Sequence, residues 1–531
     1  MKAIDKFWGF TGHSELGDPL LRILCASLFL IALGAIIQSP YILLPMIQGA
    51  SPGVCPPYFE ECAPLLNQMH QWLTANFGMN HLRVPMALAL IPIEVGLIAL
   101  ALNRTKLAWS MLFLVFLIRA VPTLLFQFPI LNFDFYDIVI LLVTLFARNK
   151  FFAAKIIFVF TYFLCSTIKF DSGWISGDYF LTLKEGLPFA GNDPVLTILA
   201  TNAVIVIQLL AGFALLSGNA KIRLAAFISF SAFHVYSAAL VGLRFPLSTI
   251  PLLIVLFAFD LQRRVDTPFK VAMTQILGDV RPNPKLTGGH GFLIGICALL
   301  FAIQVGKVMV PGNEKLSGEL STTGFYMFDA NHQCASVIEE VGADKKFQFV
   351  NQSANVYAQN RCTVWEYFYK AKQQYCTEYP PGVTRPQFAF TFLSSVNGSP
   401  YYEIVSRVNL CTVSYDYFGR NSWINLNVGN TKSFHAYQNT YGNRYGSGSV
   451  LSFDGERDGL LDQELANELE LAPIEASQRP TLGLLNELLT YFYWLVFLAL
   501  SAAFFKALIK IITTLQVKEG SVNSVTEGPG R

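Results

Sequence analysis

The chain has 531 residues, of which 53% are hydrophobic and only 14% are charged. A soluble protein carries roughly a quarter charged residues, so this composition excludes an ordinary soluble protein and indicates a large lipid-facing surface. The net charge of +2 gives no basic field that would favour binding to nucleic acid.

Long apolar runs predict a multi-pass helical membrane protein, because about 18 or more apolar residues are needed to cross a bilayer. The first run has no signal-peptide cleavage pattern and is interpreted as a membrane helix. In chain order, the predicted spans cover roughly residues 20–45, 82–102, 107–127, 130–147, 151–169, 195–216, 221–241, 247–261, 290–310 and 487–514. Pro246 and Pro251 predict that the eighth span is tilted or broken.

Basic residues predict the orientation of these spans, because short cytoplasmic loops are enriched in Lys and Arg. They occur on one predicted side at Arg104, Lys106, Arg148, Lys150, Lys221, Arg223, Arg263, Arg264, Lys270 and Lys518. We therefore expect both termini in the cytoplasm and residues 312–485 on the extracytoplasmic side. The membrane would be the plasma or inner membrane of a bacterium, or the endoplasmic reticulum of a eukaryote.

Three regions are expected: a transmembrane domain (1–311), an outer domain (312–485), and a final helix with a cytoplasmic tail (486–531). The outer domain contains short runs typical of strands at 346–350, 388–396, 401–410 and 423–428. Asn397-Gly398 predicts a hairpin, and residues 364–376 have helical spacing. The expected fold is a membrane bundle of about ten helices with an extracytoplasmic β-rich α+β domain.

Cysteine placement predicts disulfide bonds. Six of the nine cysteines lie on the predicted outer side, namely Cys55, Cys62, Cys334, Cys362, Cys376 and Cys411. An even number confined to the oxidising side favours disulfides. The pairing stays open: Cys55 can pair with Cys62, or either can form a bridge to the outer domain.

Candidate functional residues concentrate at the outer end of the fifth span, at Lys169, Asp171, Trp174 and Gly177. The structural interpretation is an interfacial anchor, with the lysine reaching water and the tryptophan in the aromatic belt. The functional interpretation is a lysine that faces a membrane cavity, where desolvation favours the neutral amine that can act as a base.

Other polar residues lie within the predicted spans. His234 is costly there unless it has a partner or faces a cavity, so it either forms a helix–helix hydrogen bond or extends toward Lys169. Asp134, at the outer end of the fourth span, could also contact Lys169. Arg119 is expected to pair with Glu94 or with an aspartate.

These residues follow a pattern shared with a known family. In the membrane part the pattern comprises Lys169, Asp171, Trp174, Gly177, Phe233-His234, Gly242 and Phe245. In the outer part it comprises GELSTTGFYMFDA (318–330) and the segments 365–376, 385–390 and 402–409. Over roughly residues 20–420 the chain thus resembles the vitamin K-dependent γ-glutamyl carboxylase family, whose membrane part is the HTTM domain.

The resemblance implies that Lys169 is the base that deprotonates vitamin K hydroquinone or another lipidic quinol, with His234 nearby. Oxidation of the quinol by O2 drives removal of a γ-proton from a glutamate side chain, to which CO2 then adds. The protein would be a carboxylase of the lyase class that acts on an exported polypeptide, and no metal is implied.

The chain departs from the family pattern at one position. The family has a histidine on the helix before the lysine, whereas this chain has Asp134 in that region. A carboxylate beside Lys169 would stabilise the ammonium, which cannot act as a base. The alternative hypothesis is therefore a non-catalytic HTTM-type membrane protein, which serves as a platform for its outer domain or for a partner protein.

Overall fold

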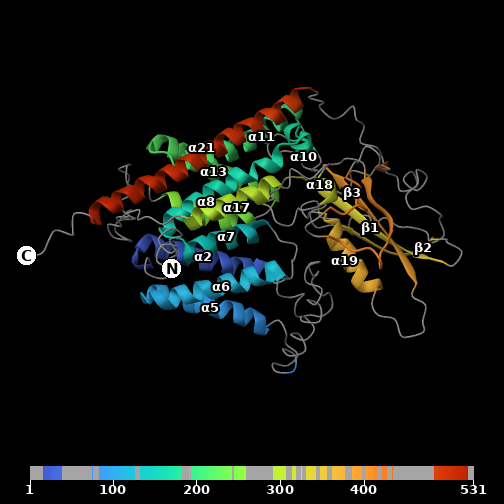
Figure 1. The fold of residues 1–531 in the computed structure, drawn as a ribbon, viewed down its shortest axis with the longest axis horizontal. Helices are drawn as coiled ribbons and strands as arrows, with labels where there is room; N and C mark the ends of the chain where they lie inside the picture. The colour runs from blue at the N-terminus through green and yellow to red at the C-terminus, as the bar shows by residue number, and fades with distance from the viewer. Residues whose placement is uncertain are drawn as a thin grey trace, which may run out of the picture.

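A computed structural model describes most helices and strands of the chain (Figure 1). The described residues are 16–38, 75, 83–125, 132–181, 191, 193–241, 244–258, 291–306, 314–318, 325, 330–342, 347–355, 362–376, 386–397, 401–416, 420–426, 433–434 and 484–523. Cys55, Cys62, Gly242 and the side chain of Asp134 lie outside them.

Each of the ten ranges predicted as spans contains a helix. These helices are α2 (Pro19–Gln38), α5 (Arg83–Ala101), α6 (Thr105–Leu125), α7 (Asn132–Phe146), α8 (Lys150–Cys165), α11 (Pro194–Val206), α13 (Ala220–Val241), α14 (Arg244–Leu253), α17 (Gly291–Gly306) and α21 (Leu484–Asn523). Among the described residues, four helical segments are long and apolar enough to cross a membrane: Pro19–Ile36, Lys150–Lys169, Pro194–Leu215 and Leu484–Ile509. They indicate a membrane protein.

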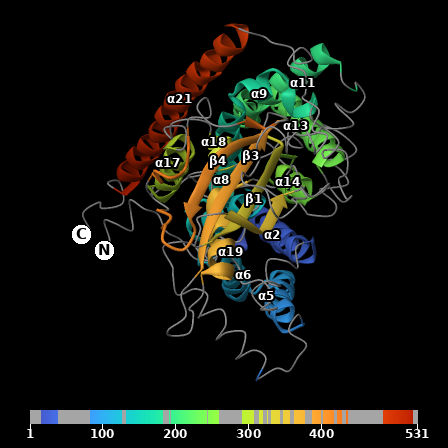
Figure 2. The same cartoon turned by 90° about the vertical axis from the view of Figure 1, so that its right-hand side faces the viewer.

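Helix α8 occupies the centre of the bundle, and α21 lies on its outside (Figures 1 and 2). Nearly every side chain of α8 from Ala153 to Cys165 is buried. By contrast, α21 exposes a row of large apolar side chains that includes Leu488, Tyr491 and Leu495. This distribution suits lipid contact for α21 and a protein environment for α8.

Among the described residues of the bundle, two segments are π-helical. Helix α11 continues through a π-helical segment, η4 (Ile207–Ala211), into α12 (Gly212–Leu215). Helix α14 contains Pro251 and continues as a second π-helical segment, η5 (Ile254–Ala258). The eighth span was predicted to be tilted or broken. It is not broken, because the helix continues without interruption from Arg244 to Ala258, and its tilt stays a prediction.

The described residues between Glu314 and Phe434 lie beyond one end of the helical bundle (Figure 1), and we call them the outer region for that reason. They form an antiparallel sheet with a helix packed on it. The strands are β1 (His332–Val341), β2 (Phe347–Asn355), β3 (Gln387–Val396), β4 (Tyr401–Asn409) and β5 (Ser433–Phe434), in the spatial order β2-β1-β3-β4-β5. Helix α19 (Val364–Tyr375) packs on one face, with the ring of Phe368 5.6 Å from that of Phe390. The expected β-rich α+β arrangement is confirmed.

The hairpin between β3 and β4 is confirmed, and Asn397 adopts the left-handed backbone (φ 51°) that suits such a turn. The strand predicted at 423–428 is wrong over residues 423–426, which begin in a turn at Trp423 and make one backbone bond to β4, from the N–H of Asn425 to the carbonyl oxygen of Ile404 at 2.8 Å. There Trp423 packs 5.0 Å from Phe368 instead of extending along the sheet. Strand β1 was not expected, because its residues are buried on both faces and show no alternation.

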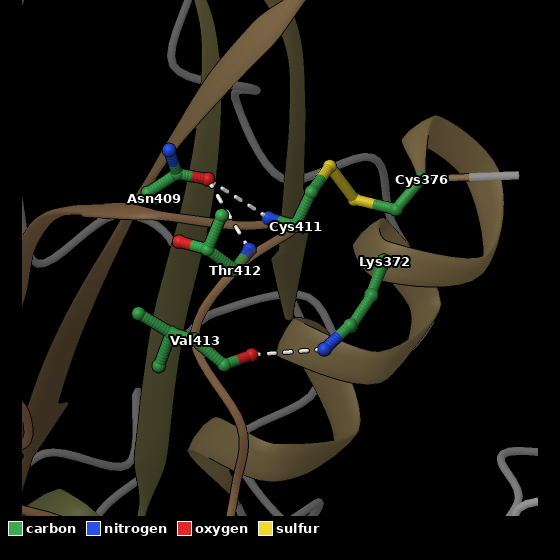
Figure 3. Close-up of a disulfide and its surroundings, with 6 residues drawn as sticks. All are labelled: Lys372, Cys376, Asn409, Cys411, Thr412 and Val413. Atoms are coloured by element: carbon green, nitrogen blue, oxygen red, sulfur yellow. Dashed lines mark hydrogen bonds between the residues drawn. A yellow bond between two sulfur atoms is a disulfide. The ribbon is translucent and has the colours of Figure 1, made fainter. Parts of the chain in front are cut away.

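Two disulfides fasten α19 to the sheet. Cys334 of β1 bonds to Cys362, and Cys376 bonds to Cys411 just after β4. Figure 3 shows the second bridge beside Lys372, whose Nζ donates to the carbonyl oxygen of Val413 at 2.8 Å. Because the four domain cysteines pair with one another, the predicted alternative of a bridge from Cys55 or Cys62 to this domain is wrong.

Candidate functional site

Lys169 ends a short 3-10 turn, η3 (Thr167–Lys169), which follows the C-terminal end of α8. The hydroxyls of Ser166 and Thr167 donate to the carbonyl oxygens of Phe163 and Leu164 at 2.6 and 2.8 Å, so the last turn of α8 is closed by its own side chains. The Lys169 side chain is 2% exposed, which contradicts the anchor interpretation in which it reaches water.

An aromatic ring lies beside the lysine. The Nζ of Lys169 is 5.0 Å from the ring centroid of Trp174. A cation–π interaction at this distance contributes up to about 2 kcal/mol for a desolvated ammonium. The indole N–H of Trp174 donates to the carbonyl oxygen of Thr201 in α11 at 2.9 Å. This bond fixes the ring face that the lysine contacts.

The spacing of Asp171, Trp174 and Gly177 has a structural explanation. Asp171 is the N-cap of α9 (Ser172–Ile175), because its carboxylate accepts from the backbone N–H of Trp174 at 3.2 Å. Gly177 has φ +85° between α9 and α10 (Asp178–Leu181), and a Cβ there would lie 2.7 Å from Cγ2 of Thr197. The motif thus builds a compact turn after the lysine.

The outer region contacts this same turn, residues 169–179, which we call the junction segment. Lys315 of α18 (Glu314–Ser317) forms an ion pair with Asp171 at 2.5 Å. Asn397, at the tip of the β3–β4 hairpin, lies against Gly173, where an added Cβ would be 2.8 Å from its Nδ2. Asn331, just before β1, donates to the carbonyl oxygen of Tyr179 at 2.7 Å.

The last helix also contacts the junction segment. Asn202 of α11 donates to the carbonyl oxygen of Ile175 at 3.0 Å and accepts from the hydroxyl of Tyr493 in α21 at 2.8 Å. The ring of Phe170 stacks on Tyr493 with centroids 5.7 Å apart. The junction segment is therefore the place where the helical bundle, α21 and the outer region meet.

His234 is fully buried and bonded at both ring nitrogens. The hydroxyl of Thr249 lies 3.1 Å from Nδ1 and also donates to the carbonyl oxygen of Phe245, so it accepts from an Nδ1–H. In that tautomer Nε2 accepts from the hydroxyl of Tyr162 at 2.6 Å. The predicted helix–helix hydrogen bond is present.

The catalytic role of His234 stays a prediction. Its partner Tyr162 precedes Lys169 by seven residues, about 10 Å along a helix. His234 therefore bonds to α8 about two turns below Lys169, and its ring acts there as a link among α8, α13 and α14.

The other predicted polar residues are placed as follows. Arg119 of α6 forms an ion pair with Asp137 of α7 at 3.3 Å, which confirms the predicted pairing with an aspartate. Asp134 lies in α7, and its contact with Lys169 stays a prediction because its side chain is outside the described residues. Of the predicted set, the structure brings Lys169, Asp171, Trp174 and Gly177 together in the junction segment.

Lys315 and Gln304 are among the residues near the lysine that sequence reasoning missed. Lys315 has no local signal, because its partner Asp171 lies 144 positions earlier in the chain. Gln304 has a local signal, because it is a polar residue inside the apolar helix α17, where it is fully buried. A buried polar side chain in an apolar span needs partners, so its position alone marks it for inspection.

Comparison with known proteins gives no further assignment of the site. The described residues contain no group of three or more His, Cys, Asp or Glu side chains that could hold a metal ion. No protein-family model, no curated protein and no solved structure matches the chain.

Proposed function

We propose that the protein is a membrane enzyme of the vitamin K-dependent γ-carboxylase type, which carboxylates glutamate in a polypeptide while it oxidises a lipidic quinol. The observation that carries the proposal is the position of Lys169. A nearly fully buried amine ends an apolar helix at the contact between the bundle and the outer region. The proposal requires Lys169 to be neutral when the quinol binds, because only the neutral amine can take a proton.

The surroundings of Lys169 suit a quinol. Phe170 follows the lysine in the chain, and the ring of Trp174 lies 5.0 Å from its amine. Both residues are buried aromatics, and flat rings of this kind pack on a quinol ring. In this proposal these rings hold the quinol, and Lys169 accepts the proton of a quinol hydroxyl. When bound, the quinol supplies the driving force: its oxidation by O2 to the epoxide and water accompanies replacement of a γ-hydrogen of glutamate by CO2.

The proposed topology has ten spans, both termini in the cytoplasm and residues 312–485 outside. The two disulfides support this orientation, because structural disulfides persist in oxidising compartments. A membrane-impermeant protease applied to intact cells or sealed vesicles tests it. Cleavage of the outer region by protease that reaches only the cytoplasmic face would refute the orientation.

The test of activity uses purified protein in lipid nanodiscs with vitamin K hydroquinone, a glutamate peptide and labelled CO2. We expect epoxide and labelled peptide from the wild type. Lys169→Ala loses the base, and Lys169→Arg keeps a cation that cannot deprotonate; both should form neither product.

Lys155 provides a matched control on the same helix. Its Nζ lies 4.9 Å from the ring of Phe151, so Lys155→Ala removes a similar lysine–aromatic contact in the N-terminal half of α8. It should leave both products unchanged. Absence of product from the wild type, or undiminished product from Lys169→Arg, would refute the proposed reaction.

The second candidate is the non-catalytic platform. It is favoured by one observation: the motif residues around Lys169 already serve to attach the outer region, through Asp171 to Lys315 and through Gly173 to Asn397. Two results together would support the platform. The wild type forms no product, and limited proteolysis shows that the outer region is no longer attached to the bundle in Lys169→Ala.

A further inference from the structure

Gln304 is a fully buried amide in α17, a helix that is otherwise almost entirely apolar. A primary amide has two N–H donors and a carbonyl acceptor. Burying these groups in an apolar helix bundle costs several kcal/mol unless each finds a partner. The partners of Gln304 therefore show what this residue does in the fold.

The amide of Gln304 bonds both backbone groups of a distant residue, Phe325. Its Oε1 accepts from the N–H of Phe325 at 2.8 Å, and its Nε2 donates to the carbonyl oxygen of Phe325 at 3.2 Å. A neighbouring strand would satisfy a residue in the same way. Phe325 lies between α18 and β1, seven residues before the sheet begins at His332, so Gln304 holds the backbone of the outer region at that residue.

The second N–H of Gln304 is directed to the turn that carries Lys169. Nε2 lies 3.2 Å from the hydroxyl oxygen of Thr167, the first residue of η3, and 3.4 Å from the carbonyl oxygen of Leu164. That hydroxyl in turn donates to the carbonyl oxygen of Leu164 at 2.8 Å. The chain of bonds from Gln304 through Thr167 to Leu164 thus closes the end of α8 two residues before the lysine.

The ring of Phe325 completes the arrangement. It is 1% exposed and lies 5.0 Å, centroid to centroid, from the ring of Phe135 in α7. Displacing the segment at Phe325 would break two hydrogen bonds to Gln304 and move this ring. The Gln304 amide would lose these two bonds, and the same amide bonds to Thr167 in η3.

We propose that Gln304 is a positioning residue for Lys169, which links the attachment of the outer region to the placement of the lysine amine. The inference rests on the proposed function for its catalytic meaning, while the link itself is a statement about structure. Movement of the segment at Phe325 releases the Gln304 amide, and Thr167 and Lys169 lose their fixed position as a consequence.

The test measures how fast Lys169 reacts with a membrane-permeant amine-acylating reagent, by mass spectrometry and relative to Lys155 in the same molecule. Thr167→Val removes only the hydroxyl, and Gln304→Met removes all amide contacts. We expect about a fivefold faster reaction of Lys169 in Thr167→Val, the equivalent of one hydrogen bond of about 1 kcal/mol, and a larger increase in Gln304→Met. Thr167→Ser keeps the hydroxyl and should restore the wild-type rate.

Gln208 is the matched control. It is also a buried glutamine of the bundle, on η4, and the proposal gives it no part. Gln208→Met should leave the acylation rate of Lys169 and the turnover number unchanged. Equal rates for Lys169 in Thr167→Val, Gln304→Met and Gln208→Met would overturn the proposal and leave Gln304 as a packing residue.

Turnover provides the readout for catalysis. If both proposals hold, Thr167→Val lowers kcat and leaves KM for the glutamate peptide unchanged, because it alters the base and not the peptide site. If the wild type forms no product but acylation of Lys169 still responds to Thr167→Val, then the proposed function is wrong and the positioning role stands.

Discussion

The ion pair between Asp171 and Lys315 predicts an unequal effect of removing its two partners. The Lys315 side chain is 6% exposed and the Asp171 side chain is 33% exposed. Asp171→Asn leaves a desolvated ammonium without this carboxylate, whereas Lys315→Met leaves a carboxylate that water can reach. Asparagine is as good an N-cap as aspartate, so Asp171→Asn tests the ion pair and not the cap of α9.

The magnitude follows from this intermediate exposure. Breaking a fully buried pair costs about 3–5 kcal/mol, and an exposed pair contributes about 0–1 kcal/mol. For this pair we expect a loss of about 2 kcal/mol from Asp171→Asn and about 1 kcal/mol from Lys315→Met, between those limits. The double variant should lose about 1–2 kcal/mol less than the sum of the two single losses.

The assay is equilibrium unfolding of the purified protein in mixed micelles by titration with SDS, combined as a double-mutant cycle. The pair between Glu366 and Lys370 on α19 is a control, because the Lys370 side chain is 51% exposed. Its coupling should not exceed about 0.5 kcal/mol. Additive losses for Asp171 and Lys315, or a larger loss from Lys315→Met than from Asp171→Asn, would refute the reasoning.

Two further predictions concern the outer region and the junction segment. Burial raises the pKa of Glu339 above its ordinary value, although Arg407 opposes this. The folded carboxyl therefore keeps its proton where the unfolded one has lost it, so the stability of the outer region should fall as pH rises from about 4.5 through the raised pKa. Glu339→Gln should flatten this dependence in thermal melts between pH 4 and 8, and an unchanged slope would contradict it. Gly177→Ala should cost at least about 1 kcal/mol in SDS titration from its left-handed backbone alone. Adding Thr197→Ser removes the nearby methyl group but should restore only part of the loss; full recovery would show that the backbone carries no strain.

The sequence predicted the helices because the signal is local. A run of apolar residues long enough for a span is a property of consecutive positions, and each predicted range contains a helix. The strands were harder. β3 and β4 flank a turn with Asn397 and were predicted, whereas β1 is buried on both faces and lacks the alternation that marks a half-buried strand.

The sequence by itself also determined where to look for a site, because Lys169, Asp171, Trp174 and Gly177 lie within nine residues of one another. Only the tertiary structure decided how these residues are used. Asp171 meets Lys315 across 144 positions, and Gln304 joins Thr167 to Phe325 across 137 and 21. Such contacts depend on how helices and outer region pack, and no pattern of neighbouring residues records that packing.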